Sequence, residues 1–321
     1  MMRVNDDRFD RRTFLKAAGV AGAAGLAGCT GDDQQEFITI GTGGTGGVYY
    51  PLGGGMADIM NENMDGVDAT AESTGASVEN CRLVGDDEMT MALALGNSVL
   101  LAVNGEGDFD EPIDLQAAFG AYQNATQVVV PEDSDVETLA DLEGLDVSVG
   151  APGSGTEVIA EELLEWYGLS YDDINEERLS FAETSDALLD GNIDAGFWSV
   201  AFPASSIEEL ASQRDVRLLD FPQEDLEAID EEFPYYAPGV IPADTYPGQD
   251  EEVNQPGVTN TMIVRADADE DFIHDVTEVI YENLDTLANV HPAAEQFEET
   301  ARAAPVDLHP GAERYFDEAG L

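Results

Sequence analysis

Lysine is almost absent from this chain of 321 residues, since its single copy is Lys16, close to the amino terminus. Lysine and arginine together number 12, against 68 aspartate and glutamate residues, which gives a formal net charge of −56. Such a chain repels nucleic acids and anionic lipid headgroups, so no nucleic-acid partner is expected. At molar salt the Debye length falls to about 3 Å, and most of the self-repulsion is screened. The composition therefore predicts a halophilic protein.

Cysteine and histidine are also rare, which limits redox and metal chemistry. Cys29 lies in a processing motif described below, so Cys81 is left without a partner and no disulfide is expected. Cys81 lies close to the apolar Leu83 and Val84, and we interpret it as a small core residue. The histidines lack the spacing of metal ligands, so we predict no metal site and expect surface or structural roles for His274, His291 and His309.

Long apolar runs are missing too, and only the first 29 residues have the pattern of a targeting segment. Asp10–Lys16 contain a twin-arginine motif, and the Ala/Gly-rich stretch that follows is too short to cross a bilayer. Leu26-Ala27-Gly28-Cys29 is a lipobox. We predict a twin-arginine lipoprotein signal peptide over residues 1–29, with cleavage before Cys29 and lipid on its sulfur; an ordinary N-terminal helix is the alternative. Residues 30–36 would then form a tether.

The rest of the chain has the composition of a folded protein, because 43% of the sequence is apolar and 8% is aromatic. Its length favours two domains over one. Strand-like and helical periodicities alternate, which predicts an α/β fold with a parallel sheet covered by helices. Strands are expected at 37–40, 67–71, 128–130, 147–149, 195–198 and 259–264, and helices at 56–64, 157–167 and 272–290. Residues 222–256 show little periodicity.

A glycine-rich loop, Gly41–Gly47, follows the first predicted strand. Gly41, Gly43 and Gly46 formally match a dinucleotide-binding fingerprint, and Asp68 follows about one βαβ unit later. No candidate residue for hydride transfer accompanies this loop. Its exposed backbone N–H groups, at the start of a helix, would offer a partial positive charge to an anion. We therefore favour an anion site, and a tight turn without a ligand is the alternative.

A second loop of this kind, Gly150–Glu157, also lies between a predicted strand and a predicted helix. Ser154 and Glu157 fit a capping box, in which the serine hydroxyl satisfies free N–H groups of the helix. Ser154 is not a hydrolase nucleophile, because Pro152 and Thr156 stand where the motif G-x-S-x-G requires glycine. Capping and ligand contact are compatible, so the two loops could face each other across a ligand.

The chain resembles the TAXI family of TRAP transporter solute receptors over residues 37–321. The segments that carry this resemblance are rich in glycine, small polar and aromatic residues; they are Ile40–Pro51, Gly75–Asn80, Ser148–Glu157, Tyr246–Gln249 and His309–Tyr315. Together they are far more specific than either glycine loop alone.

The resemblance implies a type II periplasmic-binding-protein fold, in which two α/β lobes close on a ligand through a hinge. The first lobe would comprise residues 37–126 plus 265–321 and the second residues 131–255, joined by crossover strands at 127–130 and 259–264. It also implies a receptor without a cofactor that is not an enzyme. It would capture a small carboxylate such as glutamate or another dicarboxylate and deliver it to a TRAP-type membrane permease. Such a receptor would lie outside the cytoplasmic membrane, anchored to its outer face through Cys29.

The ligand-binding residues implied by the family lie in four loops, and one further candidate lies in a strand. The loop residues are Thr42, Gly43, Gly44, Thr45, Gly46, Gly47, Tyr49, Ser73, Thr74, Ser77, Asn97, Ser98, Gly153, Ser154, Gly155 and Thr156. The strand residue is Trp198, which the family pattern does not supply and which we add as a side chain that could shape the pocket. Phe197 and Trp198 could line a cleft or fill a core. Because glycine loops alone would leave a second carboxylate poorly compensated, we expect one arginine in the cleft, chosen among Arg82, Arg178 and Arg265. The chain departs from the family pattern at 96–98 and 199–203, where specificity could be set.

Two other functions fit parts of the sequence. An exported oxidoreductase that binds NAD through the Gly41 loop would need a catalytic partner, and none is visible. A receptor that senses its ligand and signals would have the same sequence features as one that feeds a permease.

Overall fold

The computed structural model describes residues 36–233 and 235–321, so the predicted signal peptide, Cys29 and most of the predicted tether lie outside it. The strands of the described part are β1 Glu36–Gly41, β2 Val67–Glu72, β3 Met91–Leu95, β4 Leu115–Pro131, β5 Asp146–Ser148, β6 Asn175–Glu177, β7 Ala195–Val200, β8 Val216–Leu218, β9 Tyr236–Ile241 and β10 Val253–Arg265. Its α-helices are α1 Tyr49–Asn63, α2 Ser77–Gly85, α3 Gly96–Asn104, α4 Gly155–Trp166, α5 Phe181–Asp190, α6 Ser205–Gln213, α7 Gln223–Glu232, α8 Glu270–Tyr281, α9 Leu284–Ala288, α10 Phe297–Thr300 and α11 Pro310–Ala319.

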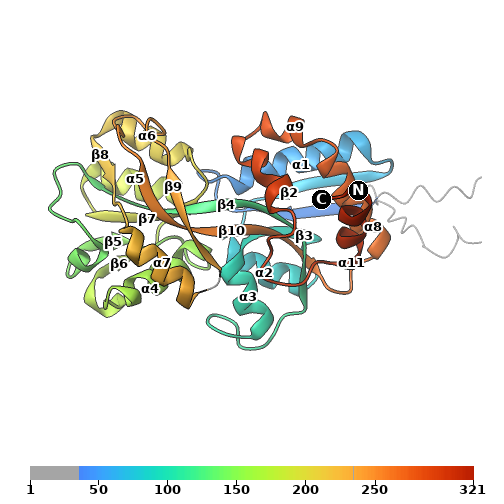
Figure 1. The fold of residues 1–321 in the computed structure, drawn as a ribbon, viewed down its shortest axis with the longest axis horizontal. Coiled ribbons are helices and arrows are strands. Elements are labelled where there is room, and N and C mark those ends of the chain that lie inside the picture. Colours follow the sequence, from blue (N-terminus) through green and yellow to red (C-terminus); the bar gives the residue numbers. More distant parts are fainter. Residues whose placement is uncertain (1–35, 234) are drawn as a thin grey trace, which may run out of the picture. The chain divides into compact units, whose positions relative to one another are not determined.

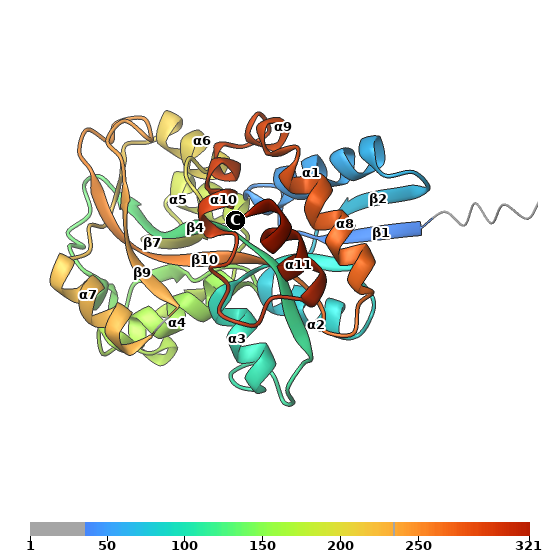
Figure 2. The same cartoon turned by 45° about the vertical axis from the view of Figure 1, so that its right-hand side comes forward.

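The strands form one mixed sheet in the order β2-β1-β3-β10-β4-β7-β5-β6, with β8 beside β4 and β9 beside β10. β1 is parallel to β2 and β3, and β5 is parallel to β6 and β7. β4 and β10 are antiparallel to each other and to their other neighbours in this order. Figure 1 shows these two long strands running between a group of elements around β1–β3 and a group around β5–β7. In Figure 2 the helices α8 and α11 lie over the first of these groups.

The two groups of parallel strands lie on either side of the pair β10 and β4 and run in opposite directions, so that their carboxyl ends approach each other. β3 ends at Leu95, whose partner in β10 is Asn260. β7 ends at Val200, whose partner in β4 is Ala125. The amide of Asn260 donates a hydrogen bond of 2.7 Å to Asn124, so these two strand ends lie close together. Ligands of α/β sheets bind beyond the carboxyl ends of parallel strands, and here two such sets of ends meet at the middle of the sheet.

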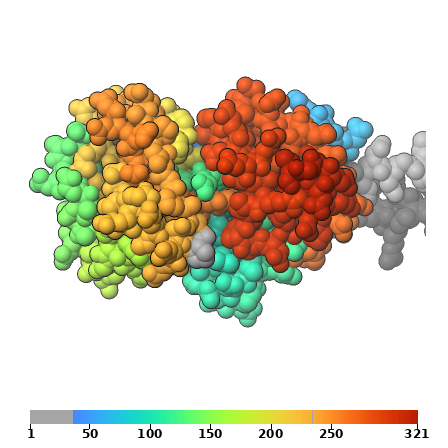
Figure 3. All heavy atoms as spheres, in the orientation of Figure 1, coloured from blue at the N-terminus to red at the C-terminus, as the bar shows by residue number. Residues whose placement is uncertain are grey.

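Aromatic rings hold the C-terminal helices against the sheet. Phe119 of β4 is fully buried and meets the Tyr281 ring of α8 edge-on, with 5.5 Å between the ring centroids. The Phe297 ring of α10 lies 5.8 Å from that of Phe119 and is stacked 6.3 Å from that of Tyr122. Because such pairs combine apolar burial with favourable ring geometry, they fix the middle of β4 from behind. Figure 3 shows the C-terminal segments, in red, covering one face of the half of the molecule that contains the group around β1–β3.

Three expectations from the sequence differ from the structure. The sheet is mixed rather than parallel, because apolar runs mark buried strands without giving their direction. The helix expected at 272–290 is divided into α8 and α9, and the Asn283 side chain donates to the Val279 carbonyl at the break. Residues 222–256 contain α7 and β9. α7 buries only Leu226 and Ile229, which explains why its periodicity is weak.

Candidate functional site

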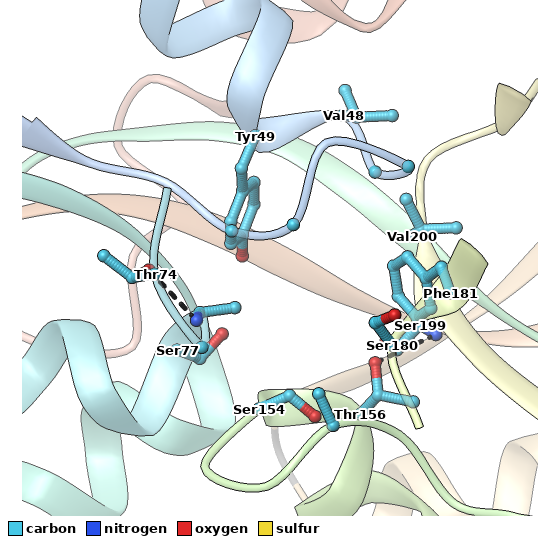
Figure 4. A pocket seen from close by; sticks show the side chains of 18 of the residues that line it. Val48, Tyr49, Thr74, Ser77, Ser154, Thr156, Ser180, Phe181, Ser199 and Val200 are labelled. Carbon is cyan, nitrogen blue, oxygen red and sulfur yellow. Dashed lines mark hydrogen bonds between the residues drawn. The ribbon is translucent and has the colours of Figure 1, made fainter. Parts of the chain in front are cut away.

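A pocket of about 300 Å³ lies where the two sets of strand ends meet. This volume is at the lower end of the range for small-molecule sites. Its wall comes from the loops after β1, β2, β5 and β6, the end of β7, and the middle of β4. The lining residues are Gly43, Gly44, Thr45, Gly46, Gly47, Val48, Tyr49, Ser73, Thr74, Gly75, Ala76, Ser77, Leu95, Tyr122, Asn124, Ala151, Ser154, Gly155, Thr156, Ser180, Phe181, Ala182, Ser199 and Val200. Figure 4 shows Tyr49 on one side of this space and Ser154 and Thr156 on the other.

The loop after β1 supplies backbone N–H groups to the pocket. Thr42 is buried and anchors the loop through its side chain, which donates a 2.6 Å hydrogen bond to the Glu72 carbonyl. The Ser73 hydroxyl donates to the Gly43 carbonyl at 2.9 Å. Within the described residues, the N–H groups of Gly43–Gly46 have no hydrogen-bond partner in the protein. Unpaired N–H groups in a concave loop form a site for an anion.

The loop after β5 brings the start of α4 to the opposite wall. Gly150, with φ of 104°, turns the chain there, and an added Cβ would meet Ser154 and Thr156. The Ser154 hydroxyl oxygen accepts from the Glu157 N–H at 3.2 Å, so the predicted cap of α4 is present. The Thr156 hydroxyl oxygen accepts from the Ser199 N–H at 3.4 Å. Both hydroxyl oxygens accept, so their hydrogen atoms are free to donate into the pocket.

A third loop, 178–182, also reaches the pocket; from the sequence only its Arg178 was considered, as one of three candidate arginines. Ser180 caps α5 and exchanges hydrogen bonds with Glu183, which holds the pKa of that carboxyl below its usual range. Phe181 and Ala182 line the pocket, and their N–H groups lie in the first turn of α5, where a helix leaves its N–H groups unpaired. The spacing of Ser180 and Glu183 is the same capping-box signal as that of Ser154 and Glu157, so the sequence held a clue to this loop.

Two buried tyrosines close the pocket from the side of the sheet. The Tyr49 hydroxyl donates to the side-chain oxygen of Asn260 at 2.5 Å, and Asn260 in turn donates to the Tyr122 carbonyl and to Asn124. Burial raises the pKa of Tyr49, and the Ser77 hydroxyl acts in the opposite direction. Burial also raises the pKa of Tyr122 well above its usual value. Both phenols are therefore neutral, and the Tyr49 hydroxyl acts as a hydrogen-bond donor.

The loop after β2 holds a strained residue at the pocket. Ala76 has φ of 76° and ψ of −142°, a conformation that side chains other than glycine rarely adopt and that costs about 1–3 kcal/mol. The next N–H groups, of Val78 and Glu79, both bond to the Gly153 carbonyl, which ties the loop after β2 to the loop after β5. Strain held by surrounding contacts is typical of ligand sites.

Most of the predicted ligand residues lie together in this wall. Those that line it are Gly43, Gly44, Thr45, Gly46, Gly47, Tyr49, Ser73, Thr74, Ser77, Ser154, Gly155 and Thr156. Those that the structure places outside the lining are Thr42, Asn97, Ser98, Gly153 and Trp198. Trp198 is fully buried, donates to the Ser206 hydroxyl at 3.1 Å, and stacks behind Phe181 with 6.2 Å between the centroids.

The wall carries no charged side chain among the described residues, and no arginine lines it. Arg82 donates to the Asp108 carbonyl, Arg178 pairs with Glu157 and Glu176 at 2.5 Å, and Arg265 pairs with Asp267 at 2.7 Å. The expected arginine anchor is therefore absent from this pocket. The remaining arginines of the described part are also bonded to protein acceptors; they are Arg214, Arg217, Arg302 and Arg314.

Solved structures of low sequence identity share this fold. A protein of Bordetella bronchiseptica is 17% identical, with 88% of this chain and 89% of that chain covered and a TM-score of 0.54. A Streptococcus mutans structure, from work on glutathione import via GshT and the cystine ABC importer TcyBC, is 15% identical, with 87% and 99% covered and a TM-score of 0.51. A putative L-cystine ABC transporter from Listeria monocytogenes is 12% identical, with 83% and 98% covered and a TM-score of 0.50. The fold is that of the type II periplasmic binding proteins.

The family of the chain follows from its sequence. The NMT1-like family matches residues 40–320, so the chain belongs to this family. None of the helices between residues 36 and 321 has both the length and the apolar character needed to span a membrane.

Proposed function

We propose that this protein is an extracytoplasmic solute receptor that captures a small carboxylate and hands it to a membrane permease. The observation that carries the proposal is the pocket itself. Residues with free N–H groups and hydroxyl hydrogens line a small space at the carboxyl ends of two sets of strands, and among the described residues no nucleophile–base pair or metal-ligand cluster lines it. Such a wall can bind and orient an anion. We therefore propose a binding protein and not an enzyme, without a cofactor.

We further propose that the permease is of the TRAP type and that the receptor is of the TAXI kind. Three of the five segments that carry the sequence resemblance form the loops after β1, β2 and β5, and these loops contribute to the pocket wall. Export by the twin-arginine route and lipid on Cys29 would hold the receptor at the outer face of the cytoplasmic membrane. The family membership and the fold support the receptor role at a coarser level.

Ligand capture would involve two lobes, residues 37–126 plus 265–321 and residues 131–255. The crossovers at 127–130 and 259–264 lie within β4 and β10. These two strands pair with each other over Leu115–Ala125 and Gly257–Arg265, and the stretch 127–130 of β4 continues beside β7 and β8. Two strands that run between lobes can flex together and allow hinge closure. Closure would bury the carboxylate and strengthen its hydrogen bonds, because water is excluded.

The receptor proposal is tested by a thermal-shift screen of residues 30–321 in molar salt. The screen includes glutamate, glutamine, 2-oxoglutarate, succinate, small monocarboxylates and NAD. A ligand at a hundred times its Kd adds about 2.7 kcal/mol to the free energy of unfolding, which raises the midpoint by several degrees. We expect a shift with at least one small carboxylate and none with NAD. A shift with NAD alone would contradict the proposal and favour an oxidoreductase.

The Thr156 hydroxyl offers a direct test of how the carboxylate is held. Thr156→Val keeps the shape of this buried side chain and removes its hydroxyl, both as a donor to the ligand and as the acceptor of the 3.4 Å bond from the Ser199 N–H. We expect the affinity for the carboxylate identified in the screen to fall about tenfold, the loss of one hydrogen bond to a charged group. Thr156→Ser retains the hydroxyl and should stay within about threefold of the wild type. Titration calorimetry in molar salt measures both, and equal losses in the two variants would contradict this role.

A further inference from the structure

The charges around the pocket exclude part of the class of small carboxylates as ligands. Three carboxylates lie in the first turns of α2, α4 and α5, and each already accepts an N–H bond from its own loop. Glu79 bonds to Gly75, Glu157 to Gly153, and Glu183 to Ser180. The arginine that pairs with one of these carboxylates is Arg178, whose guanidinium is held by Glu157 and Glu176. A second carboxylate on the ligand would meet no cation and would be repelled by its surroundings.

A ligand ammonium group would also lack a partner in the lining. No aspartate or glutamate belongs to the wall formed by the described residues, and the three nearby carboxylates are engaged by backbone N–H groups. Transfer of a charged group from water into a pocket that offers it no partner is strongly disfavoured. The apolar part of the wall, which includes Val48, Leu95 and Phe181, instead suits an uncharged ligand body.

Among the buried side-chain polar atoms of the described wall, one has no partner. Tyr122 is fully buried in β4, and its hydroxyl makes no hydrogen bond with any described residue. Its ring is fixed by stacking on Phe297, at an interplanar angle of 13°. Buried hydroxyl groups are normally hydrogen-bonded, so this hydroxyl is a donor that closure of the pocket around a ligand could satisfy. The Tyr122 hydroxyl can donate to a neutral oxygen of the ligand.

We propose that the pocket binds a small monocarboxylate whose uncharged body carries a hydroxyl or carbonyl oxygen in contact with Tyr122. This inference rests on the proposed receptor function and narrows it, because it disfavours glutamate and dicarboxylates. The carboxylate would take the N–H groups of the Gly43–Gly46 loop and the donors at the start of α4. The second oxygen would lie against the sheet.

Matched ligands of equal length test the charge requirement. Titration calorimetry in 1 M and 3 M NaCl would measure the affinities for five ligands of five carbons: pentanoate, 2-hydroxypentanoate, 2-oxopentanoate, 2-oxoglutarate and norvaline. Monocarboxylates of two, three, four and six carbons would be measured in the same way. We expect one of the 2-hydroxy or 2-oxo monocarboxylates to bind at least about tenfold more tightly than 2-oxoglutarate and norvaline. The preference should persist at 3 M NaCl, because it arises from local desolvation rather than from the field of the acidic surface.

Other outcomes separate this inference from the receptor proposal. Equal or tighter binding of 2-oxoglutarate, glutamate or norvaline would overturn the inference and leave the receptor proposal standing. Absence of binding by every monocarboxylate would overturn it as well. Absence of binding by every carboxylate tested would overturn both.

Tyr122→Phe tests the second contact. The hydroxyl has no protein partner, so its removal should leave the unfolding midpoint unchanged or slightly raised. We expect affinity for 2-hydroxypentanoate to fall about tenfold while affinity for pentanoate stays within about twofold. Tyr281→Phe is the matched control, since Tyr281 is buried, donates to the Phe297 carbonyl and lies outside the pocket wall. Equal losses for both acids, or no loss for either, would overturn the role of Tyr122.

Discussion

Replacement of Gly46 by leucine is expected to abolish ligand binding and to leave the fold intact. Gly46 lines the pocket, and a Cβ placed on it would lie 3.5 Å from the Ala182 nitrogen and 3.7 Å from Phe181. These are ordinary contact distances, so the backbone need not move. The longer leucine side chain would cover N–H groups at the start of α5 and occupy space that the ligand needs. We expect the affinity for the carboxylate identified by thermal shift to fall at least about a hundredfold, close to 3 kcal/mol.

Gly54→Leu provides the matched control for this experiment. Gly54 lies in α1, outside the pocket, and a Cβ there meets no atom within 4 Å. Leucine is a better helix former than glycine by somewhat under 1 kcal/mol, so this variant should be at least as stable as the wild type. Both variants are compared by calorimetry and by thermal unfolding in molar salt. Retained binding in Gly46→Leu, together with a native unfolding midpoint, would show that the pocket is not the ligand site.

The parts of the site that the sequence predicts well are those made by contiguous residues. The loops after β1, β2 and β5 are built from glycine, serine and threonine between a strand and a helix, and their backbone N–H groups are set by local geometry. Residues that are adjacent in the sequence of these loops are therefore also adjacent in the pocket wall. Gly43 and Ser154 were predicted in this way, Ser77 was carried over from the family resemblance, and all three line the pocket.

The parts that the sequence does not predict depend on strand pairing. Tyr122 and Asn124 reach the pocket because β4 pairs with both β7 and β10, and Ser199 reaches it because β7 ends there. Apolar alternation identifies such strands but gives neither their order nor their direction. The absence of the expected arginine from the wall could not be predicted from the sequence either. The position of Arg178 relative to the pocket depends on its pairing with Glu157, which no spacing in the sequence reveals.

Asn97 and Ser98 illustrate the limit of carrying family positions onto a chain. Both are fully buried at the start of α3, and the Ser98 carbonyl lies near the thiol of Cys81. Small polar residues serve equally well in ligand contact and in close packing of a helix start. Sequence alone cannot separate these uses, since both require a short side chain at the same place in the loop.

Trp198 is expected to matter for stability far more than for ligand contact. The sequence left open whether this residue lines a cleft or fills a core, and it is fully buried in β7 with Gly196 packed against its ring. Trp198→Ala should lower the free energy of unfolding by about 3–5 kcal/mol, as for other large buried aromatic residues. At about 2–4 °C per kcal/mol, the thermal midpoint should fall by roughly 10 °C.

Trp198→Phe separates core packing from direct ligand contact. Phenylalanine keeps a ring behind Phe181 but removes the hydrogen bond to Ser206, which should lower the free energy of unfolding by about 1–3 kcal/mol. Because Trp198 lies behind the wall rather than in it, carboxylate affinity measured well below the midpoint should stay within about threefold of the wild type. A tenfold loss of affinity with an unchanged midpoint would instead place Trp198 in contact with the ligand. That result would mean that the bound state exposes this ring, and that lobe movement reshapes the wall around Phe181.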